Sequence, residues 1–168
     1  MPKVSIILPN YNHSKFLAQR LESIFNQTFQ DFEVILLDDC SPDNSREILG
    51  HYRNHPKVSA LIYNEINSGS TFKQWQKGIS IASGDYVWLA ESDDYCETNF
   101  LNELVPLLDK YADASIAYCQ SVSVDEKNIV LYNWQKHTDI FQPNIWKNNF
   151  CIKGSDGILN FFIYRNVI

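Results

Sequence analysis

The chain has 168 residues, of which 45% are apolar and 20% are charged, and its formal net charge at pH 7 is −6. This length and balance predict one folded domain with its own core and exclude a disordered protein. No stretch approaches the ~20 apolar residues that cross a bilayer, so we expect a soluble protein. The net acidity argues against a nucleic-acid partner, but it permits a nucleotide held through a divalent cation.

The start of the chain and its cysteines indicate a cytosolic protein. The apolar residues 1–9 are too short for a signal peptide, and no small-residue cleavage site follows them. The four cysteines lie far apart without a C-x-x-C pair, which indicates neither a zinc site nor a disulfide framework. We therefore expect residence in the cytosol and reduced, mostly buried thiols. These are Cys40, Cys96, Cys119 and Cys151.

The first part of the chain alternates buried strands with amphipathic helices. Residues 4–8 and 32–37 are continuous β-branched and aliphatic runs, which are typical of strands buried on both faces of a mostly parallel sheet. Between these strands, Ser14 can cap a helix whose apolar residues recur at helical spacing. Its apolar positions are Leu17, Leu21, Ile24 and Phe25.

The same alternation continues along the chain. A helix at about residues 44–52 leads to a strand at 58–63, and another amphipathic helix leads to a strand at 86–89. The apolar face of that second helix consists of Phe72, Trp75, Ile79 and Ala82. Repeated βαβ units predict an α/β domain with a mostly parallel sheet flanked by helices.

The pattern is less regular after the fourth strand. We expect a helix near residues 99–108, a strand near 115–118 and a hairpin formed by 122–124 and 129–132. The last expected elements are a helix at 155–164 and the approach to another strand at 164–168.

Three polar clusters follow predicted strands. They are residues 9–12, 38–43 and 91–94. In open α/β sheets, ligands bind outside the carboxyl ends of the strands, where these clusters converge. The hard oxygen ligands of residues 91–94 suit Mg²⁺ or Mn²⁺, and grouped acids in a chain of net charge −6 are easier to explain with a cation among them. Taken singly, each cluster also fits helix caps and turns.

The residues around these clusters resemble the family 2 glycosyltransferases. The resemblance covers residues 2–108 in the right order and spacing. Its segments are residues 5–12 (SIILPNYN), 23–28 (SIFNQT), 32–41 (FEVILLDDCS) and 82–86 (ASGDY), leading into 91–94 (ESDD). It implies a Rossmann-like GT-A fold that binds a nucleoside diphosphate sugar and transfers the sugar with inversion. It also implies a divalent cation, Mn²⁺ or Mg²⁺, that neutralises the departing diphosphate.

The resemblance assigns roles to five positions. Tyr11 matches the aromatic residue that stacks on the base, and Pro9 begins the same nucleotide-lining turn; the alternative for Tyr11 is a plain core aromatic. Asp39 matches the carboxylate that accepts the imide N–H of uracil, which favours a uridine or thymidine donor and leaves guanosine open. Asp93 matches the metal-ligating acid of the D-x-D motif. Glu91 stands where most relatives have the first Asp, a contact to ribose or metal-bound water.

Two further positions of the family pattern are less clear. Asp94 is left out of the metal set, because it fits an orienting or capping role equally well. The position where many relatives carry an Arg near the diphosphate is Trp75, so a basic contact there must come from Lys73 or Lys77. Both lysines also fit a solvated helix face.

The catalytic general base has no convincing candidate in this chain. Asp156 fits a helix start with Ser or Asp as cap. In the family the base lies further along, so we expect it beyond Ile168 and expect this chain to be truncated at its C-terminus. The predicted organisation is one GT-A domain, with residues 1–110 as the nucleotide-sugar-binding half and 111–168 as the start of the acceptor-side half. The expected partners are the donor and a saccharide or glycoconjugate acceptor, with the full-length enzyme cytoplasmic or associated with the inner face of a membrane.

Three other functions compete with this prediction. A non-catalytic nucleotide-sugar-binding module stays open, because no general base is identified. A sugar-nucleotide pyrophosphorylase needs a glycine-rich turn after the first strand, and residues 10–13 contain no glycine. A phosphoacceptor receiver domain needs an Asp ending the third strand and a Lys ending the fifth. Tyr63 and Tyr118 stand at about those places instead.

Overall fold

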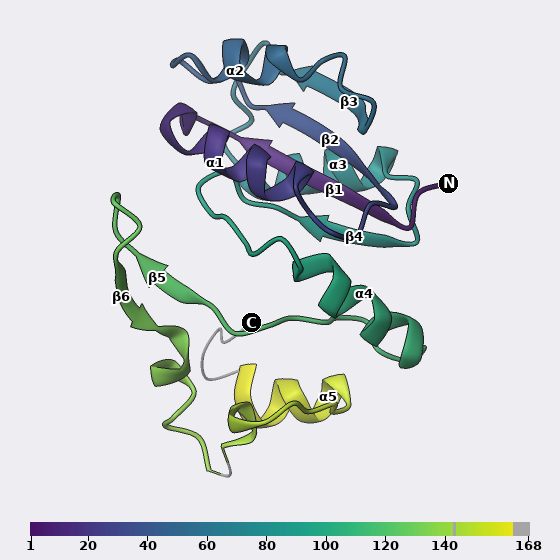
Figure 1. Ribbon diagram of the computed structural model, residues 1–168, viewed down its shortest axis with the longest axis vertical. Helices are drawn as coiled ribbons and strands as arrows, with labels where there is room; N and C mark the ends of the chain where they lie inside the picture. The colour runs from purple at the N-terminus through teal and green to yellow at the C-terminus, as the bar shows by residue number, and fades with distance from the viewer. Residues whose placement is uncertain (143, 163–168) are drawn as a thin grey trace. The chain divides into compact units, whose positions relative to one another are not determined.

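The computed structural model describes residues 1–142 and 144–162. The chain divides into two compact units, Met1–Glu103 and Leu104–Ile168. Each is described by itself below (Figure 1). The predicted division at residue 110 into donor and acceptor halves stays a prediction. Among the described residues, no helix is both long enough and apolar enough to span a bilayer.

A four-stranded parallel sheet forms the centre of the first unit. Its strands are β1 (Val4–Asn10), β2 (Phe32–Asp38), β3 (Val58–Tyr63) and β4 (Tyr86–Leu89). Their order in the sheet is β3-β2-β1-β4, and every neighbouring pair is parallel. The chain therefore moves from β1 through β2 to β3 in one direction and then crosses to the other side of β1. This reversal creates the switch point at which open α/β sheets bind ligands.

The continuous apolar runs of β1 and β2 are buried, as their sequences predict. Every residue of β1 is buried, and Ile7, Ile35 and Leu37 have no exposed surface at all. Helix α3 (Thr71–Ile81) approaches β1 closely at Gly78, because a Cβ atom added there would lie 2.3 Å from Cγ2 of Ile7. The sheet is thus covered on both faces, and its polar residues are confined to the strand ends.

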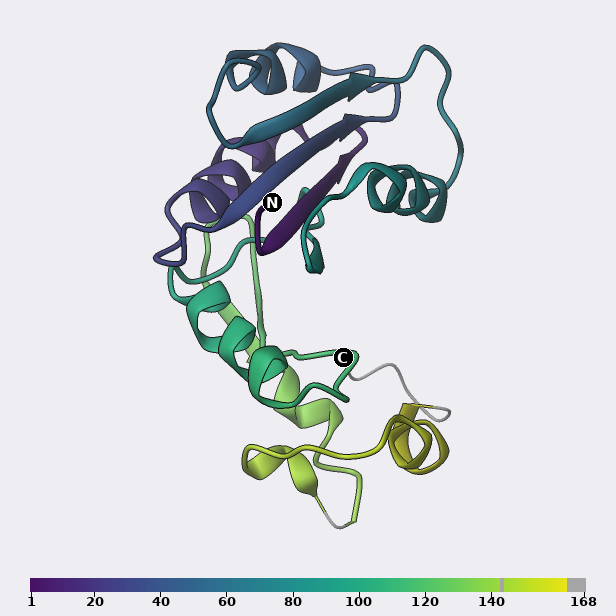
Figure 2. The same ribbon diagram turned by 90° about the vertical axis from the view of Figure 1, so that its right-hand side faces the viewer.

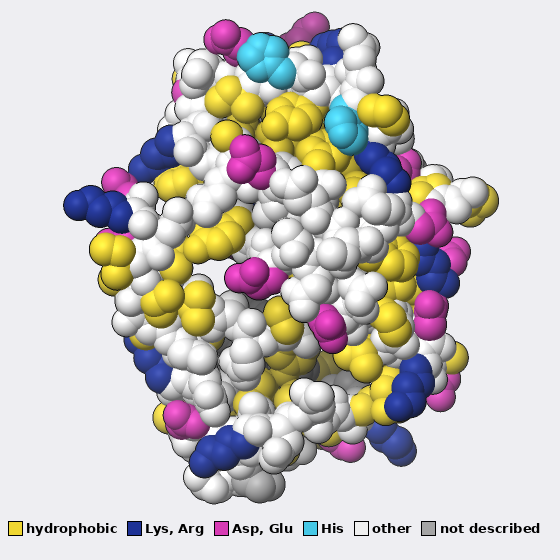
Figure 3. Space-filling view, viewed as in Figure 1, with side chains coloured by type: hydrophobic (Ala, Val, Ile, Leu, Met, Phe, Trp, Pro, Cys, Tyr) yellow, Lys and Arg dark blue, Asp and Glu magenta, His cyan; other side chains and the backbone are white. Residues whose placement is uncertain are grey.

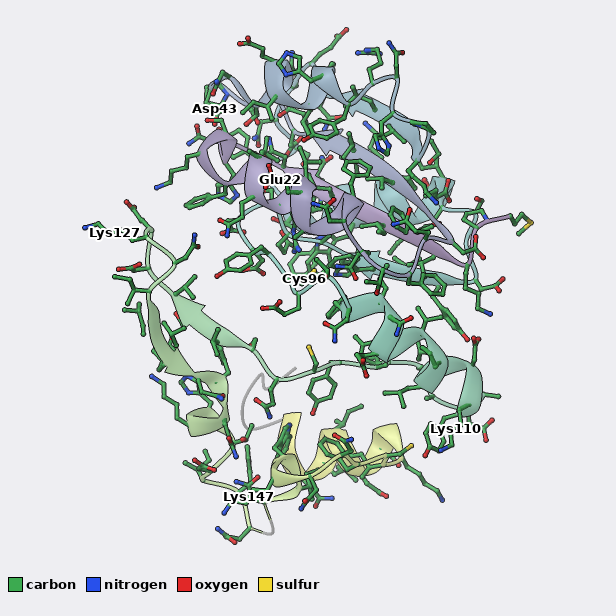
Figure 4. The ribbon with its side chains drawn as sticks, in the orientation of Figure 1. Glu22, Asp43, Cys96, Lys110, Lys127 and Lys147 are labelled. Atoms are coloured by element: carbon green, nitrogen blue, oxygen red, sulfur yellow. The ribbon has the colours of Figure 1, made fainter. Side chains whose placement is uncertain are left out.

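Helices cover the two faces of this sheet. Helix α1 (Ser14–Phe25) and helix α2 (Ser45–His51) lie on one face and α3 lies on the other, as the two perpendicular views show (Figures 1 and 2). The predicted cap of α1 is wrong: His13 occupies the cap position without a side-chain hydrogen bond, and Ser14 is the first helical residue. Asp43 replaces the expected cap, since its carboxylate accepts hydrogen bonds from the backbone N–H groups of Ser14 (2.9 Å) and Ser45 (3.0 Å) (Figure 4).

The second unit contains short elements. Helix α4 (Phe100–Lys110) runs across the boundary between the units, and strands β5 (Val122–Val124) and β6 (Val130–Asn133) form the expected antiparallel hairpin. The remaining elements are η1 (Trp134–His137), η2 (Ile145–Lys147), α5 (Gly154–Gly157) and the π-helical turn η3 (Ile158–Phe162). The cap of α5 is Lys153, which makes no side-chain cap bond, so the expected Ser or Asp cap is wrong.

Two further expectations need correction. No strand forms at residues 115–118, where Ile116 is 65% exposed and therefore contributes no buried side to a sheet. The cysteines are not mostly buried: Cys40 and Cys96 are half-buried, and Cys119 and Cys151 are exposed, because all four lie in connecting segments. The expected end of the helix at residue 164 and the strand approach at 164–168 lie outside the described residues.

Candidate active site

A cleft of about 390 Å³ opens at the carboxyl edge of the four-stranded sheet. It is lined by the loops that follow β1, β2, β3 and β4 and by the first turns of α3. Four of the five residues assigned from the sequence meet there: Pro9, Tyr11, Asp39 and Glu91. The cleft lies at the switch point between β1 and β4, where the fold rule places a ligand.

The loop after β1 presents Tyr11 to the cleft. The tyrosine is 48% exposed, so the alternative of a plain core aromatic is wrong. The loop is held in a sharp turn, with Asn12 at a φ of 58° and its backbone N–H donating to Oγ of Ser41 at 3.0 Å. Asn10 also donates to that hydroxyl, at 3.0 Å. The loops after β1 and β2 are therefore joined directly beside the exposed ring.

The two acids at the end of β2 lie in different environments. Asp38 is fully buried, accepts hydrogen bonds from Asn10 (3.0 Å) and from Arg46 Nε (2.8 Å), and is absent from the cleft lining. Asp39 is 4% exposed and lines the cleft. The structure thus assigns Asp38 to holding the loop and only Asp39 to the cleft.

Four donors surround the carboxylate of Asp39. Its Oδ1 accepts from Asn64 Nδ2 (2.6 Å), Ser68 N (2.9 Å) and Gln74 Nε2 (2.9 Å), and its Oδ2 accepts from Ser68 Oγ (2.7 Å). Burial raises the pKa of this carboxyl, but the hydrogen bonds from Ser68 and Asn64 and the charge of Lys77 outweigh burial and lower it. Asp39 is therefore an ionised acceptor, and Oδ2 keeps capacity for one more hydrogen bond.

Glu91 is held by an indole. The residue is half-buried, and its Oε1 accepts a hydrogen bond from Nε1 of Trp75 at 2.8 Å. Burial raises the pKa of Glu91, the Trp75 hydrogen bond lowers it, and the charges of Asp93 and Asp94 raise it further; the net shift is upward. Trp75, at the position where the sequence comparison expects the family's arginine, thus orients Glu91 in the turn at residues 91–94.

Asp93 lies outside the cleft lining but beside it. Its side chain is 49% exposed, and its Oδ1 is 3.9 Å from Nδ1 of His13, which lines the cleft. The same nitrogen of His13 is 2.8 Å from Oγ of Ser92. The sequence prediction overlooked His13, although its place directly after the polar cluster at residues 9–12 was a usable signal.

The turn at residues 91–94 does not form a complete metal cage. Among residues 1–142 and 144–162, no group of three or more His, Cys, Asp or Glu side chains could hold a metal ion. A half-exposed carboxylate such as that of Asp93 fits an ion that takes most of its ligands from substrate phosphates and water. The described side chains at this turn therefore supply fewer ligands than Mn²⁺ or Mg²⁺ needs, and such an ion would take the others from substrate or water.

The β3–α3 loop supplies cleft residues that the sequence prediction missed. Asn67, Gly69 and Ser70 line the cleft, and Gln74 follows them from α3. The polar composition of this loop predicts a turn and carries no signal of its own for a binding site. Neither Lys73 nor Lys77 lines the cleft: Lys73 Nζ donates to the carbonyl of Ser68 and Lys77 Nζ donates to Oδ1 of Asn64.

Known proteins match this chain along most of its length. The family model described as glycosyl transferase family 2 matches residues 5–166. Glycosyltransferase GlyG of Streptococcus pneumoniae serotype 4 is 32% identical over 153 residues, which are 89% of this chain and 46% of that protein. Poly(ribitol-phosphate) β-N-acetylglucosaminyltransferase TarS of Staphylococcus aureus is 36% identical over 115 residues, which are 66% of this chain and 20% of that protein.

A solved structure extends the match to three dimensions. The structure of S. aureus TarS residues 1–349 in complex with UDP-GlcNAc superposes with a TM-score of 0.61 at 26% identity, over 73% of this chain and 40% of that one. This chain spans less than half the length of the GlyG and TarS proteins it matches. The sequence motifs, the GT-A-like parallel sheet and the family model agree, and the chain belongs to the family 2 glycosyltransferases.

Proposed function

We propose that the protein containing this chain transfers a sugar from a UDP-sugar to a hydroxyl acceptor, with inversion and with the help of Mn²⁺ or Mg²⁺. One observation carries the proposal: Pro9, Tyr11, Asp39 and Glu91 line a single cleft at the carboxyl edge of the sheet. Membership of the family supports the reaction class. The UDP-GlcNAc complex of TarS supports a uridine donor by analogy.

The base-binding end of the cleft contains Tyr11 and Asp39. The exposed ring of Tyr11 offers a stacking surface, and such stacking contributes about 1 to 3 kcal/mol per base. The ionised Asp39 accepts the imide N–H of uracil at Oδ2 and disfavours cytosine, which has an acceptor at that position. Guanine also carries a ring N–H donor, so a guanosine donor is the second candidate for the measurement below.

The diphosphate end contains the turn at residues 91–94. Asp93 would contribute the protein ligand of the divalent cation, and Glu91, oriented by Trp75, would contact the ribose or a metal-bound water. When bound, the cation supplies Lewis-acid stabilisation of the charge that develops on the departing diphosphate. The residues of this chain then bind and orient the donor.

The acceptor side belongs to the same proposal. The acceptor is a saccharide or glycoconjugate hydroxyl, and its general base is expected beyond Ile168.

Lys and Arg side chains are scattered over the face of the sheet unit seen in Figure 3, without one basic surface on that face. Cytosolic residence and contact with the inner face of a membrane stay predictions of the sequence.

Calorimetric titration tests the donor site directly. UDP, CMP and GDP are titrated into this chain with Mn²⁺ and, separately, with EDTA. We expect UDP binding that requires Mn²⁺. In Asp93→Ala the affinity for UDP in the presence of Mn²⁺ should fall by ~10-fold or more. Loss of an outer-shell metal partner already costs ~10-fold, and Asp93 is the proposed direct ligand. Asp85→Ala is the matched control, because it removes one exposed acid at the opposite edge of the sheet.

The outcomes separate the candidates. Binding of GDP in place of UDP would move the donor to guanosine, with the same cleft. Metal-independent binding, or no binding of any nucleotide, would contradict the donor site in this chain. Equal losses in Asp93→Ala and Asp85→Ala would remove Asp93 from the proposed metal site.

A further inference from the structure

Arg20 is a buried cation on a helix that packs against the sheet. It lies in α1 and is 3% exposed, whereas arginine is rarely buried without a partner. Removing a guanidinium from water is costly unless hydrogen bonds and opposite charges compensate. The surroundings of Arg20 therefore indicate why the charge is there.

The contacts of Arg20 lead to the turn that follows β4. Its Nε donates to the backbone carbonyl of Glu91 at 2.7 Å, and its guanidinium lies over the ring of Trp88, 5.3 Å from the centroid. Its Nη1 is buried and has no hydrogen-bond partner among the described residues. One nitrogen is thus fixed on the turn and another is left unsatisfied.

The carboxylates that face Arg20 belong to the same turn, and Cys96 follows that turn in the chain. Burial lowers the pKa of the guanidinium, and Cys96, Asp94, Glu91 and Asp93, in that order, oppose this shift. Arg20 in turn lowers the pKa values of Glu91 and Asp94, which burial and the neighbouring acids raise. Cys96, on the segment between β4 and α4, is labelled in Figure 4.

We infer that Arg20 is a positioning residue: its buried guanidinium is a fixed internal cation beneath the turn at residues 91–94, and it makes tight binding of a divalent cation there depend on the diphosphate. The inference rests on the proposed donor site. It goes beyond that site because it gives an electrostatic role to Arg20, which lines no part of the cleft.

The reasoning follows from charge balance within the turn. Three carboxylates in four residues repel one another, and a cation held at the turn by a 2.7 Å hydrogen bond relieves the repulsion before any metal arrives. The same positive charge repels a free divalent ion. A diphosphate brings negative charge and additional ligands, so the ion and the nucleotide bind tightly only together.

The test compares Mn²⁺ binding with and without UDP in Arg20→Met, Arg20→Lys and the unaltered chain. Free Mn²⁺ is counted from its EPR signal. Without UDP, we expect Arg20→Met to bind Mn²⁺ about tenfold more tightly, because the repelling charge is gone. Arg20→Lys keeps the charge and should stay within about twofold of the unaltered chain. Arg53→Met is the matched control, since Arg53 is exposed, lies over the ring of Tyr63 and lines no part of the cleft.

A purely packing role for Arg20 predicts a loss of stability in Arg20→Met without tighter Mn²⁺ binding, and that result overturns the inference. If Arg20→Met does not fold, tenfold tighter Mn²⁺ binding by Arg20→Lys overturns it as well. Absence of Mn²⁺-dependent UDP binding in the unaltered chain contradicts the donor site instead. In that case the affinity for Mn²⁺ without UDP can still be compared between Arg20→Met and the unaltered chain.

Discussion

Asp38 and Asp39 follow one another at the end of β2, and only the second lines the cleft. Successive residues of an extended segment point to opposite sides, so adjacent acids can serve different neighbours. The resemblance to the family predicted that Asp39 is the ligand-facing acid. The sequence could not predict the donors Asn64, Ser68 and Gln74, because they come from a loop and helix that follow the next strand.

At the scale of single residues, Trp75→Phe tests the anchor of Glu91. The substitution keeps an aromatic ring and removes the N–H that donates to Glu91 Oε1 at 2.8 Å. We expect the free energy of unfolding at pH 7 to fall by about 1.5 to 3 kcal/mol, as for a lost hydrogen bond to a charged group. Urea unfolding measures this change.

A double-mutant cycle separates that hydrogen bond from ring packing. In a Glu91→Ala background, Trp75→Phe should cost less than about 0.5 kcal/mol, because the acceptor is already absent. An equal cost in both backgrounds would assign the effect of Trp75 to packing, including its edge-to-face contact with Phe72. The hydrogen bond would then have no measurable part in holding Glu91.

At the scale of elements, Asp43 joins the starts of α1 and α2. Asp43→Ala removes the acceptor of two helix N-termini, so we expect a loss of about 1 to 3 kcal/mol at pH 7. Burial raises the pKa of Asp43, but the hydrogen bonds from Ser45 and Ser14 outweigh it and lower the pKa from 3.8 to about 2. Because the pKa of Asp43 is lower in the folded state than in the unfolded state, its ionised carboxylate stabilises the fold at pH values above the unfolded-state pKa. The difference between the two proteins should therefore shrink as the pH falls from 3.8 towards about 2.

Asp43→Asn is the control for this prediction. Asparagine does not titrate, but its NH2 group replaces one of the two acceptor oxygens that bind Ser14 N and Ser45 N, so this variant should keep roughly half of the Asp43 contribution at pH 7. Its stability relative to the original chain should rise as the pH falls through the same window. A pH-independent difference for Asp43→Ala would contradict the ionised cap.

The elements also show where sequence patterns were sufficient. Strands β1 and β2 were predictable because an apolar run buried on both faces has few alternatives. The segment at residues 115–118 has a similar composition but leaves Ile116 exposed, since a strand forms only where a neighbouring strand pairs with it. The cap of α1 was missed because Asp43 is distant in sequence from Ser14.

At the scale of the whole molecule, the βαβ rhythm and the family resemblance predicted a parallel sheet with its site at the carboxyl edge. The cleft combines loops that are far apart in the chain, so its lining could be predicted only where a family motif marked it. Arg20 and His13 could not be predicted in this way, because neither belongs to the motif of the acidic turn at residues 91–94. Arg20 lies in α1 and His13 directly before it, and each contacts that turn only because α1 packs against the end of β4.

Ligand binding should stabilise the sheet unit as a whole and protect its loops. At a free ligand concentration of 100 times Kd, linkage predicts a gain of about 2.7 kcal/mol. With UDP and Mn²⁺, hydrogen exchange should slow at the loops of residues 9–13, 64–70 and 91–94, each of which contributes residues to the cleft lining. The β5–β6 hairpin contributes no cleft residue and should exchange as before. Asp93→Ala at the same concentrations supplies the unprotected reference, and protection that appears only in the hairpin would place the nucleotide outside the cleft.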